Sequence, residues 1–199
     1  MIKRNILSVF IVLLLSIFLC SNGYAEEAEA KRDWFINSYT ALLTNSDLQK
    51  TLSLYTDSHD AYLTALTVGK RIGSYKKYID AEVEGQIVRY YVKQDHWEFN
   101  AAFVLRWQPF LWDKVLDTSF AIGNGLSYAS EVPELEEKHH VNATQLLHFL
   151  MIELTFALPD YPKWNLITRI HHRSGIWGAF DNVRGGTNAI GLGIKYFWE

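Results

Sequence analysis

The sequence predicts an all-β protein, an eight-stranded antiparallel up-and-down transmembrane β-barrel of the bacterial outer membrane. Three observations support this fold class. The N-terminus resembles an export signal, no second long apolar run follows it, and the rest of the chain contains eight segments in which polar and apolar residues alternate. Alternation with a period of two places polar side chains on one face of a strand and apolar ones on the other.

Residues 1–25 are expected to be a secretory signal peptide. Two basic residues precede an apolar run from Ile6 to Leu19, and small residues follow up to Ala25, after which we expect cleavage. The run is shorter than the roughly 20 residues that cross a bilayer as a helix. The barrel domain is then 26–199, which contains no cysteine because Cys20 leaves with the signal. Its stability must therefore come from packing and backbone pairing.

Charge and composition exclude some classes of function. The formal net charge is −3, and loss of the two basic residues of the signal makes it −5, with no basic stripe. Nucleic-acid binding is therefore not expected. Aromatic residues make up 15% of the chain, which suits a barrel with aromatic girdles but also an ordinary soluble domain. A lipoprotein anchor at Cys20 is disfavoured because bulky Leu19 precedes it.

The first four predicted strands are segments of roughly ten residues between turn-rich stretches. They are Trp34–Leu43, Asp60–Arg71, Tyr78–Tyr91 and Asp95–Gln108. In the third and fourth, Glu82, Glu84 and Glu98 share one face and apolar residues the other. Lipid does not tolerate such carboxylates, so we expect them to face a polar lumen and to form a network with Arg89 or Arg106.

The last four predicted strands are Lys114–Tyr128, Thr144–Leu158, Trp164–Ser174 and Asn188–Trp198. The first of them is Gly-rich near its end. Residues 148–157 alternate acceptably as a strand but could equally form a buried helix, and Pro159 ends either one. The charged stretch Val132–Val141 is expected to be an exposed loop that can contain a helical turn. The final strand ends in aromatic residues, like the terminal strand of outer-membrane proteins, although Glu199 adds a charge after them.

An even number of strands lets the first and last strands pair, which closes a barrel and removes exposed edges. Eight strands leave little room inside, so a wide pore is not expected. A soluble periplasmic barrel that binds lipid would alternate in the same way with its apolar face inward. Tryptophans near segment ends favour the membrane barrel as interfacial anchors, namely Trp97, Trp107, Trp112, Trp164, Trp177 and Trp198.

The seventh predicted strand carries an H-x-S pair. His172 and Ser174 are two residues apart, so they stand side by side on one face, a spacing that suits a base beside a hydroxyl nucleophile. Arg169 and Arg173 lie on the other face together with His171. Cationic side chains avoid lipid, so the arginine face is expected to be luminal and the H-x-S pair to face the membrane.

The segment Arg169–Gly175 resembles the outer-membrane lipid A deacylases, which are eight-stranded barrels of the acyloxyacyl-hydrolase type. That family carries an H-x-S pair on its penultimate strand, and its serine hydrolyses an ester-linked acyl chain of lipid A. The resemblance implies that His172 is the catalytic histidine, that Ser174 is the nucleophile, and that lipid A in the outer leaflet is the partner. It is best over residues 164–198 and elsewhere rests on length and strand pattern.

The chain departs from the family pattern at two places. The family has an acidic residue on the last strand that orients the histidine, whereas this chain has Asn188 in that zone. An amide can orient a neutral imidazole by hydrogen bonding, so we rank Asn188 first as the third member, then Asp181, then Glu153. The family's asparagine after the serine, an oxyanion helper, is replaced by Gly175, and a backbone N–H could substitute for it.

Three functions follow from this reading. The first is an outer-membrane esterase that removes an acyl chain from lipid A with Ser174 and His172. The second is a non-catalytic outer-membrane barrel with a structural or interaction role, which the missing acid favours, and the third is a periplasmic lipid-binding barrel. No cofactor motif is present. His139 and His140 lie near several glutamates, but a solvated loop is favoured over a metal site because the spacing is unorganised.

Overall fold

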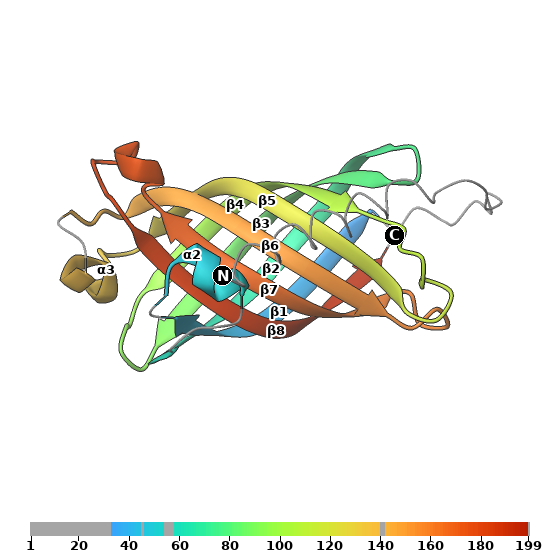
Figure 1. Cartoon of the computed structure of the whole chain (residues 1–199), viewed down its shortest axis with the longest axis horizontal. Coiled ribbons are helices and arrows are strands. Elements are labelled where there is room, and N and C mark those ends of the chain that lie inside the picture. Colours follow the sequence, from blue (N-terminus) through green and yellow to red (C-terminus); the bar gives the residue numbers. More distant parts are fainter. Residues whose placement is uncertain (1–32, 45, 54–57, 140–141, 199) are drawn as a thin grey trace, which may run out of the picture.

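The computed structural model describes residues 33–44, 46–53, 58–139 and 142–198, so the expected signal peptide lies outside the described residues. Eight strands form one closed antiparallel barrel, in which each strand pairs with the next along the chain. The last strand returns to pair with the first from Trp34↔Trp198 to Thr44↔Asn188 (Figure 1). The predicted eight-stranded antiparallel all-β barrel is confirmed.

The strands agree with the predicted segments to within a few residues. They are β1 (Trp34–Thr44), β2 (Ser58–Tyr75), β3 (Ile79–Tyr91), β4 (Trp97–Trp107), β5 (Asp117–Ala129), β6 (Leu146–Ala157), β7 (Trp164–Ser174) and β8 (Gly186–Trp198). The helical alternative for residues 148–157 is wrong, because they form most of β6. β2 runs past its expected end at Arg71 because a register shift between Arg71 and Gly73 breaks the alternation there without ending the pairing with β3.

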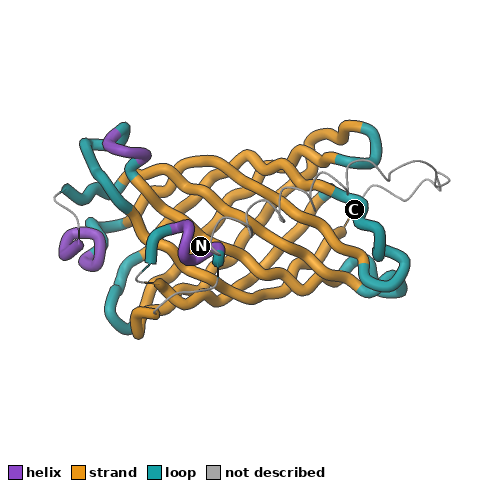
Figure 2. Tube along the Cα trace, in the orientation of Figure 1, coloured by secondary structure: helices purple, strands orange, loops and turns teal. Residues whose placement is uncertain are grey.

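The two ends of the barrel differ. Three short helices lie in the connections at one end: α2 (Leu48–Leu52), α3 (Glu134–His139) and the 3-10 turn η1 (Ile176–Gly178) (Figure 2). The expected helical turn in the charged stretch is therefore α3, but the expected exposure is wrong for part of it, because Leu135 and Glu136 are buried. The opposite end has the shorter connections 76–78, 108–116 and 158–163, together with the paired strand ends at Trp34 and Trp198. In the described part of the chain, no helix has the length and hydropathy to cross a membrane.

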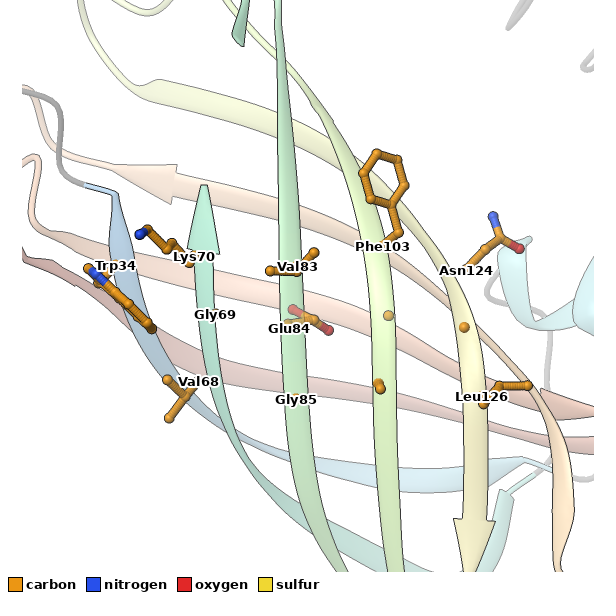
Figure 3. A pocket seen from close by; sticks show the side chains of 13 residues that line it. Trp34, Val68, Gly69, Lys70, Val83, Glu84, Gly85, Phe103, Asn124 and Leu126 are labelled. Atoms are coloured by element: carbon orange, nitrogen blue, oxygen red, sulfur yellow. The ribbon is translucent and has the colours of Figure 1, made fainter. Parts of the chain in front are cut away.

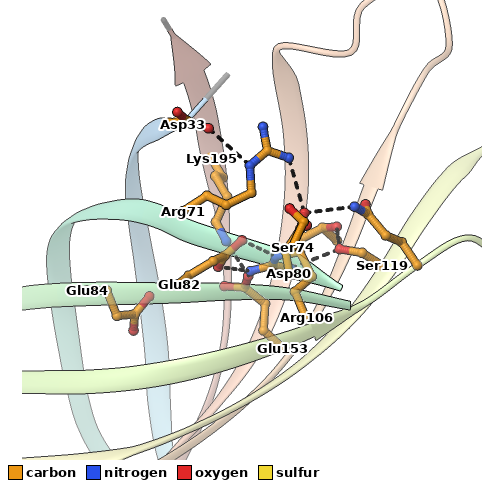
Figure 4. A network of polar contacts seen from close by, with 12 residues as sticks. Asp33, Arg71, Ser74, Asp80, Glu82, Glu84, Arg106, Ser119, Glu153 and Lys195 are labelled. Carbon is orange, nitrogen blue, oxygen red and sulfur yellow. Dashed lines mark hydrogen bonds and ion pairs between the residues drawn. The ribbon is translucent and has the colours of Figure 1, made fainter. Parts of the chain in front are cut away.

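The inner wall carries a polar and ionic network beside clusters of buried apolar side chains. Arg106 Nε donates to Glu82 at 2.8 Å, and Arg106 Nη2 donates to Glu153 at 2.8 Å. Lys195 also pairs with Glu153, which brings these four side chains together inside the barrel (Figure 4). All of them are buried. The predicted luminal network with Arg106 is confirmed, whereas the alternative partner, Arg89, pairs with Asp95 instead.

Two further luminal pairs lie deeper along β7. Arg169 Nη1 donates to Glu84 at 2.9 Å, and His171 Nε2 lies 2.9 Å from Glu98. Buried ionic side chains thus occupy the interior along much of its length. A soluble lipid-binding barrel requires an apolar interior instead, so these buried charges argue against that alternative.

The outer wall is apolar. Its exposed large side chains include Leu66, Val68, Val83, Ile87, Phe99, Phe103, Leu105, Ile122, Leu126, Leu166, Leu192 and Ile194. On β7 the two faces separate as predicted. Arg169 and Arg173 are at most 1% exposed on the inside, while His172 and Ser174 are half-buried on the outside.

Candidate active site

The outer wall carries a polar cluster at the end of the barrel where the helices lie. Antiparallel pairing places Thr44 of β1 beside Asn188 of β8, and Asn188 beside His172 of β7. Residues paired in this way project from the same face of a sheet. The strand register therefore brings together, on the outside, residues that are far apart in the sequence.

His172 and Asn188 form a hydrogen-bonded couple. His172 Nδ1 lies 2.7 Å from Asn188 Oδ1, and Asn188 Nδ2 donates to the backbone carbonyl of Ser46 at 2.8 Å. The Ser46 carbonyl can only accept, so it fixes which end of the amide faces the imidazole. Asn188 Oδ1 in turn can only accept, so Nδ1 carries the imidazole proton and Nε2 keeps a lone pair. His172 is thereby held in the tautomer of a general base.

The segment after β1 covers this couple. Asp47 caps α2 by accepting from the Lys50 backbone N–H at 2.9 Å, which fixes the start of the helix. Thr51 of α2 then contacts Thr44 on the barrel wall through their hydroxyls at 3.0 Å. As a result Asn188 is only 4% exposed although it belongs to the outer face. Burial shields its hydrogen bonds from competing water.

Ser174 lies on the same outer face but is not bonded to His172. Residues two apart on a strand are separated by about 6.6 Å along the backbone. Within the described residues, no hydrogen bond joins the Ser174 hydroxyl to His172. A rotation of the side chains is needed to bring the hydroxyl and the imidazole into contact.

The three predicted site residues line one groove on the outer surface. Its volume is about 940 Å³, and its wall includes His172, Ser174 and Asn188. Trp177 of η1 stands at its edge and is 92% exposed. Ile176 and Trp177 both have positive φ, 44° and 52°, a backbone conformation that bulky residues rarely adopt. Such strain often marks a functional surface.

The lower-ranked candidates for the third member lie elsewhere. Asp181 is in the β7–β8 connection, where it accepts from the Thr144 hydroxyl at 2.8 Å. Glu153 is inside the barrel, paired with Arg106, Arg169 and Lys195. Neither hydrogen-bonds to His172, whereas Asn188 does. The first-ranked residue is therefore the one that the fold places beside the imidazole.

The expected oxyanion donor is engaged by the backbone. The N–H of Gly175 donates to the carbonyl of Gly185 at 3.1 Å, across the start of the β7–β8 connection. It is therefore not free to stabilise a developing negative charge, so a backbone N–H that substitutes for the family's asparagine would have to come from another residue. The cause of this engagement is continued strand pairing beyond Ser174.

Sequence reasoning missed a second imidazole in the same groove. His148 of β6 lines it, and the strand register pairs His148 directly with Ser174. His148 Nε2 lies 3.1 Å from Asn124 Oδ1 of β5, so the groove holds two histidine–asparagine couples. The alternation of β6 could have revealed this residue, because His148 is two positions before Leu150 and therefore lies on the same outward face.

A shallower apolar depression adjoins the groove across β2 to β5. It has a volume of about 590 Å³, and Val83, Phe103 and Leu126 stand around it (Figure 3). Its floor is low where the small outward residues Gly85 and Ala101 pair with each other. Asn124 lines both this depression and the groove with the two imidazoles, so the two are adjacent on the outer wall.

Across the described ranges, no group of three or more His, Cys, Asp or Glu side chains is arranged to hold a metal ion. His140 of the sequence's charged stretch lies outside the described residues. The candidate site residues carry hydroxyl, imidazole and amide groups, and the carboxylate of Asp47, which also lines the groove, caps α2.

Comparison with known proteins gives a likeness in fold only. No protein-family model and no curated protein sequence match the chain. The crystal structure of the outer-membrane enzyme PagL is similar, with a TM-score of 0.55 and 10% identity over 81% of this chain and 98% of that one. The structure of Neisserial surface protein A (NspA) is also similar, with a TM-score of 0.51 and 11% identity over 84% of this chain and 98% of that one. At these identities the likeness shows the barrel fold.

Proposed function

We propose that the protein is a bacterial outer-membrane esterase that removes an ester-linked acyl chain from lipid A (lipopolysaccharide), with Ser174 as nucleophile and His172 as base. One observation carries the proposal. The oriented imidazole–amide couple His172–Asn188 lies in a groove on the apolar outer wall, on the same face as Ser174. A base and a hydroxyl on an apolar exterior are not expected of a soluble enzyme, whereas a lipid hydrolase needs them on the surface that contacts lipid.

The structure supports a membrane location with the site in the outer leaflet. The outer wall is apolar, and tryptophans begin or end four of the strands, as interfacial anchors do. Outer-membrane barrels have short turns on the periplasmic side and longer loops outside. The long connections that follow β1, β5 and β7 are at the same end as the groove. The groove then opens toward the leaflet that contains lipopolysaccharide.

The first half of the reaction is transfer of the acyl group to Ser174. His172 Nε2 accepts the Ser174 hydroxyl proton while Oγ attacks the ester carbonyl and forms a tetrahedral intermediate. When the intermediate collapses, the bond to the sugar oxygen breaks, and His172 returns the proton to that oxygen. Asn188 holds the ring throughout by accepting from Nδ1. The products are a deacylated sugar hydroxyl and an acyl-enzyme.

The second half is hydrolysis of the acyl-enzyme. Water adds to the acyl carbonyl, an imidazole of the groove takes one water proton, and that proton passes to Ser174 Oγ as its bond to the acyl carbon breaks. A fatty acid leaves and the enzyme is restored. The apolar depression beside Asn124 offers a surface along which the acyl chain lies during both halves.

Mass spectrometry of lipid A tests the proposal. Cells that express the wild-type chain should lose one ester-linked acyl chain from lipid A, and cells that express Ser174→Ala should not. Thr168→Ala is the matched control, because Thr168 is on the same face of β7, is half-buried and does not line the groove. Unchanged lipid A with folded wild-type protein in the outer membrane would contradict the proposal.

A non-catalytic surface barrel is the second candidate. Two observations favour it: Ser174 is not hydrogen-bonded to His172, and the Gly175 N–H is already used. The similarity in fold to Neisserial surface protein A is compatible with it. Under this alternative, wild type and Ser174→Ala give identical lipid A, and no acyl adduct forms on Ser174.

A further inference from the structure

We infer that His148 is a second catalytic imidazole, the base that activates water when the acyl-enzyme is hydrolysed. The inference rests on the proposed esterase function and assigns a separate task to each histidine of the groove. His172 serves the transfer of the acyl group to Ser174, and His148 serves its release. Three observations support this division.

The first observation is position. His148 on β6 is the direct cross-strand partner of Ser174 on β7. Directly opposed residues of an antiparallel pair have Cβ atoms about 4.5–5.5 Å apart. That is nearer than the roughly 6.6 Å between positions two apart on one strand, as for His172 and Ser174. An acyl group on Ser174 Oγ is therefore flanked by His148 on the side away from β8.

The second observation is the state of the ring. Asn124 Oδ1 accepts a hydrogen bond and cannot donate one, so the 3.1 Å contact places the imidazole proton on His148 Nε2. The lone pair is then on Nδ1. With its oxygen toward the ring, Asn124 holds His148 in a base tautomer with the two ring nitrogens exchanged relative to His172, although no second hydrogen bond among the described residues fixes this amide as Ser46 fixes that of Asn188.

The third observation is an unsatisfied acceptor. His148 Nδ1 is buried and has no hydrogen-bond partner among the described residues. Buried polar atoms in proteins nearly always have a partner, so this orphan indicates a missing donor, which reaches Nδ1 when the His148 side chain turns toward the groove that it lines. Water is the donor that the second half of the reaction supplies.

The proposed step balances in atoms and charge. A water oxygen bonds to the acyl carbon of the Ser174 ester while one water proton moves to His148 Nδ1. The tetrahedral intermediate then expels Ser174 Oγ, and the proton passes from Nδ1 to Oγ. The fatty acid leaves with the water oxygen, and both imidazoles are neutral again.

Burst kinetics with a long-chain p-nitrophenyl ester test the inference, using the full chain folded in detergent micelles. Such an ester has a good leaving group, so nitrophenol release reports acyl transfer and the later steady rate reports hydrolysis. His148→Gln should give a burst of about one nitrophenol per protein, followed by a steady rate about 100-fold or more below wild type, the size of a general-base contribution. Intact-mass measurement should show the acyl adduct, which Ser174→Ala lacks.

Leu146→Gln is the matched control. Leu146 is two residues before His148 on the same outer face of β6, is 43% exposed, and does not line the groove. It should behave like wild type, which separates loss of a base from the cost of a polar residue on the outer wall. Heat-modifiable gel mobility confirms that each variant has folded.

The outcomes are distinguishable. A steady rate of His148→Gln equal to wild type would overturn the role of His148, and so would equal losses of burst and steady rate, which point to acyl transfer or to structure. Absence of turnover and of any adduct in the wild type overturns the esterase itself. A burst in His172→Gln but not in His148→Gln would reverse the two assignments.

Discussion

Asn188 Oδ1 accepts from His172 Nδ1 at 2.7 Å while its amide nitrogen donates to the Ser46 carbonyl at 2.8 Å. An amide that is held at both ends does for a neutral imidazole what a carboxylate does in many serine hydrolases, namely fix the tautomer and the ring orientation. It does not supply a negative charge to stabilise an imidazolium. The site is therefore built for orientation more than for charge stabilisation.

The first prediction concerns Asn188. Asn188→Ala leaves the His172 Nδ1–H without its buried acceptor, which costs about 1–3 kcal/mol and corresponds to roughly 5- to 150-fold in kcat. Asn188→Asp keeps the acceptor and should be more active than Asn188→Ala on the same ester. It loses the donor to Ser46, so its thermal midpoint should fall below wild type. Equal activity of the two variants would contradict the orienting role.

The second prediction concerns the apolar depression. An added Cβ at Gly85 has as its nearest neighbour the Asn100 carbonyl oxygen at 3.9 Å, an ordinary contact, so Gly85→Leu should fold and fill the depression. We expect KM for a long-chain ester to rise while turnover of a short-chain ester is unchanged. Gly73→Leu is the control, because a Cβ there meets nothing within 4 Å and the position lies outside the depression.

The third prediction concerns the lumen. Glu153 is fully buried and receives hydrogen bonds from Arg106, Arg169 and Lys195. Glu153→Gln leaves three buried cations with one carboxylate fewer, so the free energy of unfolding should fall by about 3–5 kcal/mol. Urea titration of the barrel in lipid vesicles measures this loss. Asp160→Asn, which removes an exposed acid from the β6–β7 turn, should have no effect beyond about 0.5 kcal/mol.

The fourth prediction concerns pH and Glu136 of α3. Burial raises the pKa of the Glu136 carboxyl from 4.5 to about 7, against the lowering effects of Arg173 and of the Thr187 hydroxyl. A raised acid pKa means that the folded state holds the proton more tightly than the unfolded state. Stability that Glu136 contributes is thus present below pH 4.5 and is lost as the pH rises to about 7.

Comparison of wild type with Glu136→Gln over this range checks the sign. The unfolding free energy of wild type relative to Glu136→Gln should fall by an amount on the order of 3 kcal/mol between pH 4.5 and 7.5 and then level off. Urea midpoints at fixed ionic strength provide the measurement. A difference that grows with pH would show that the ion pair with Arg173 outweighs the burial of the carboxyl.

The barrel could be predicted because its signal is local. On β3, Glu82 and Glu84 alternate with apolar neighbours, and on β7, Arg169 and Arg173 alternate with His172. These patterns indicate which face is inside without knowledge of the neighbouring strands. β6 was ambiguous because its inward residues, such as Phe149, are apolar too. Apolar side chains on both faces remove the period that separates strand from helix.

The site could be predicted only in part because it depends on register. Asn188 was identified from its distance along the chain, but its second bond to Ser46 joins the ends of the sequence and has no local signature. His148 was missed as a site residue because its position opposite Ser174 follows from the β6–β7 pairing. The engagement of the Gly175 N–H likewise follows from pairing beyond β7.

The seam between β8 and β1 links the orientation of the His172 ring to closure of the barrel. His172 belongs to the penultimate strand and Asn188 to the last one. The carbonyl that orients the Asn188 amide belongs to Ser46, which comes just after the first strand. The bond from Asn188 to Ser46 can form only when β8 has paired with β1. The proposed hydrolytic activity is then expected only of the closed barrel, because only there is the amide that orients His172 held at both ends.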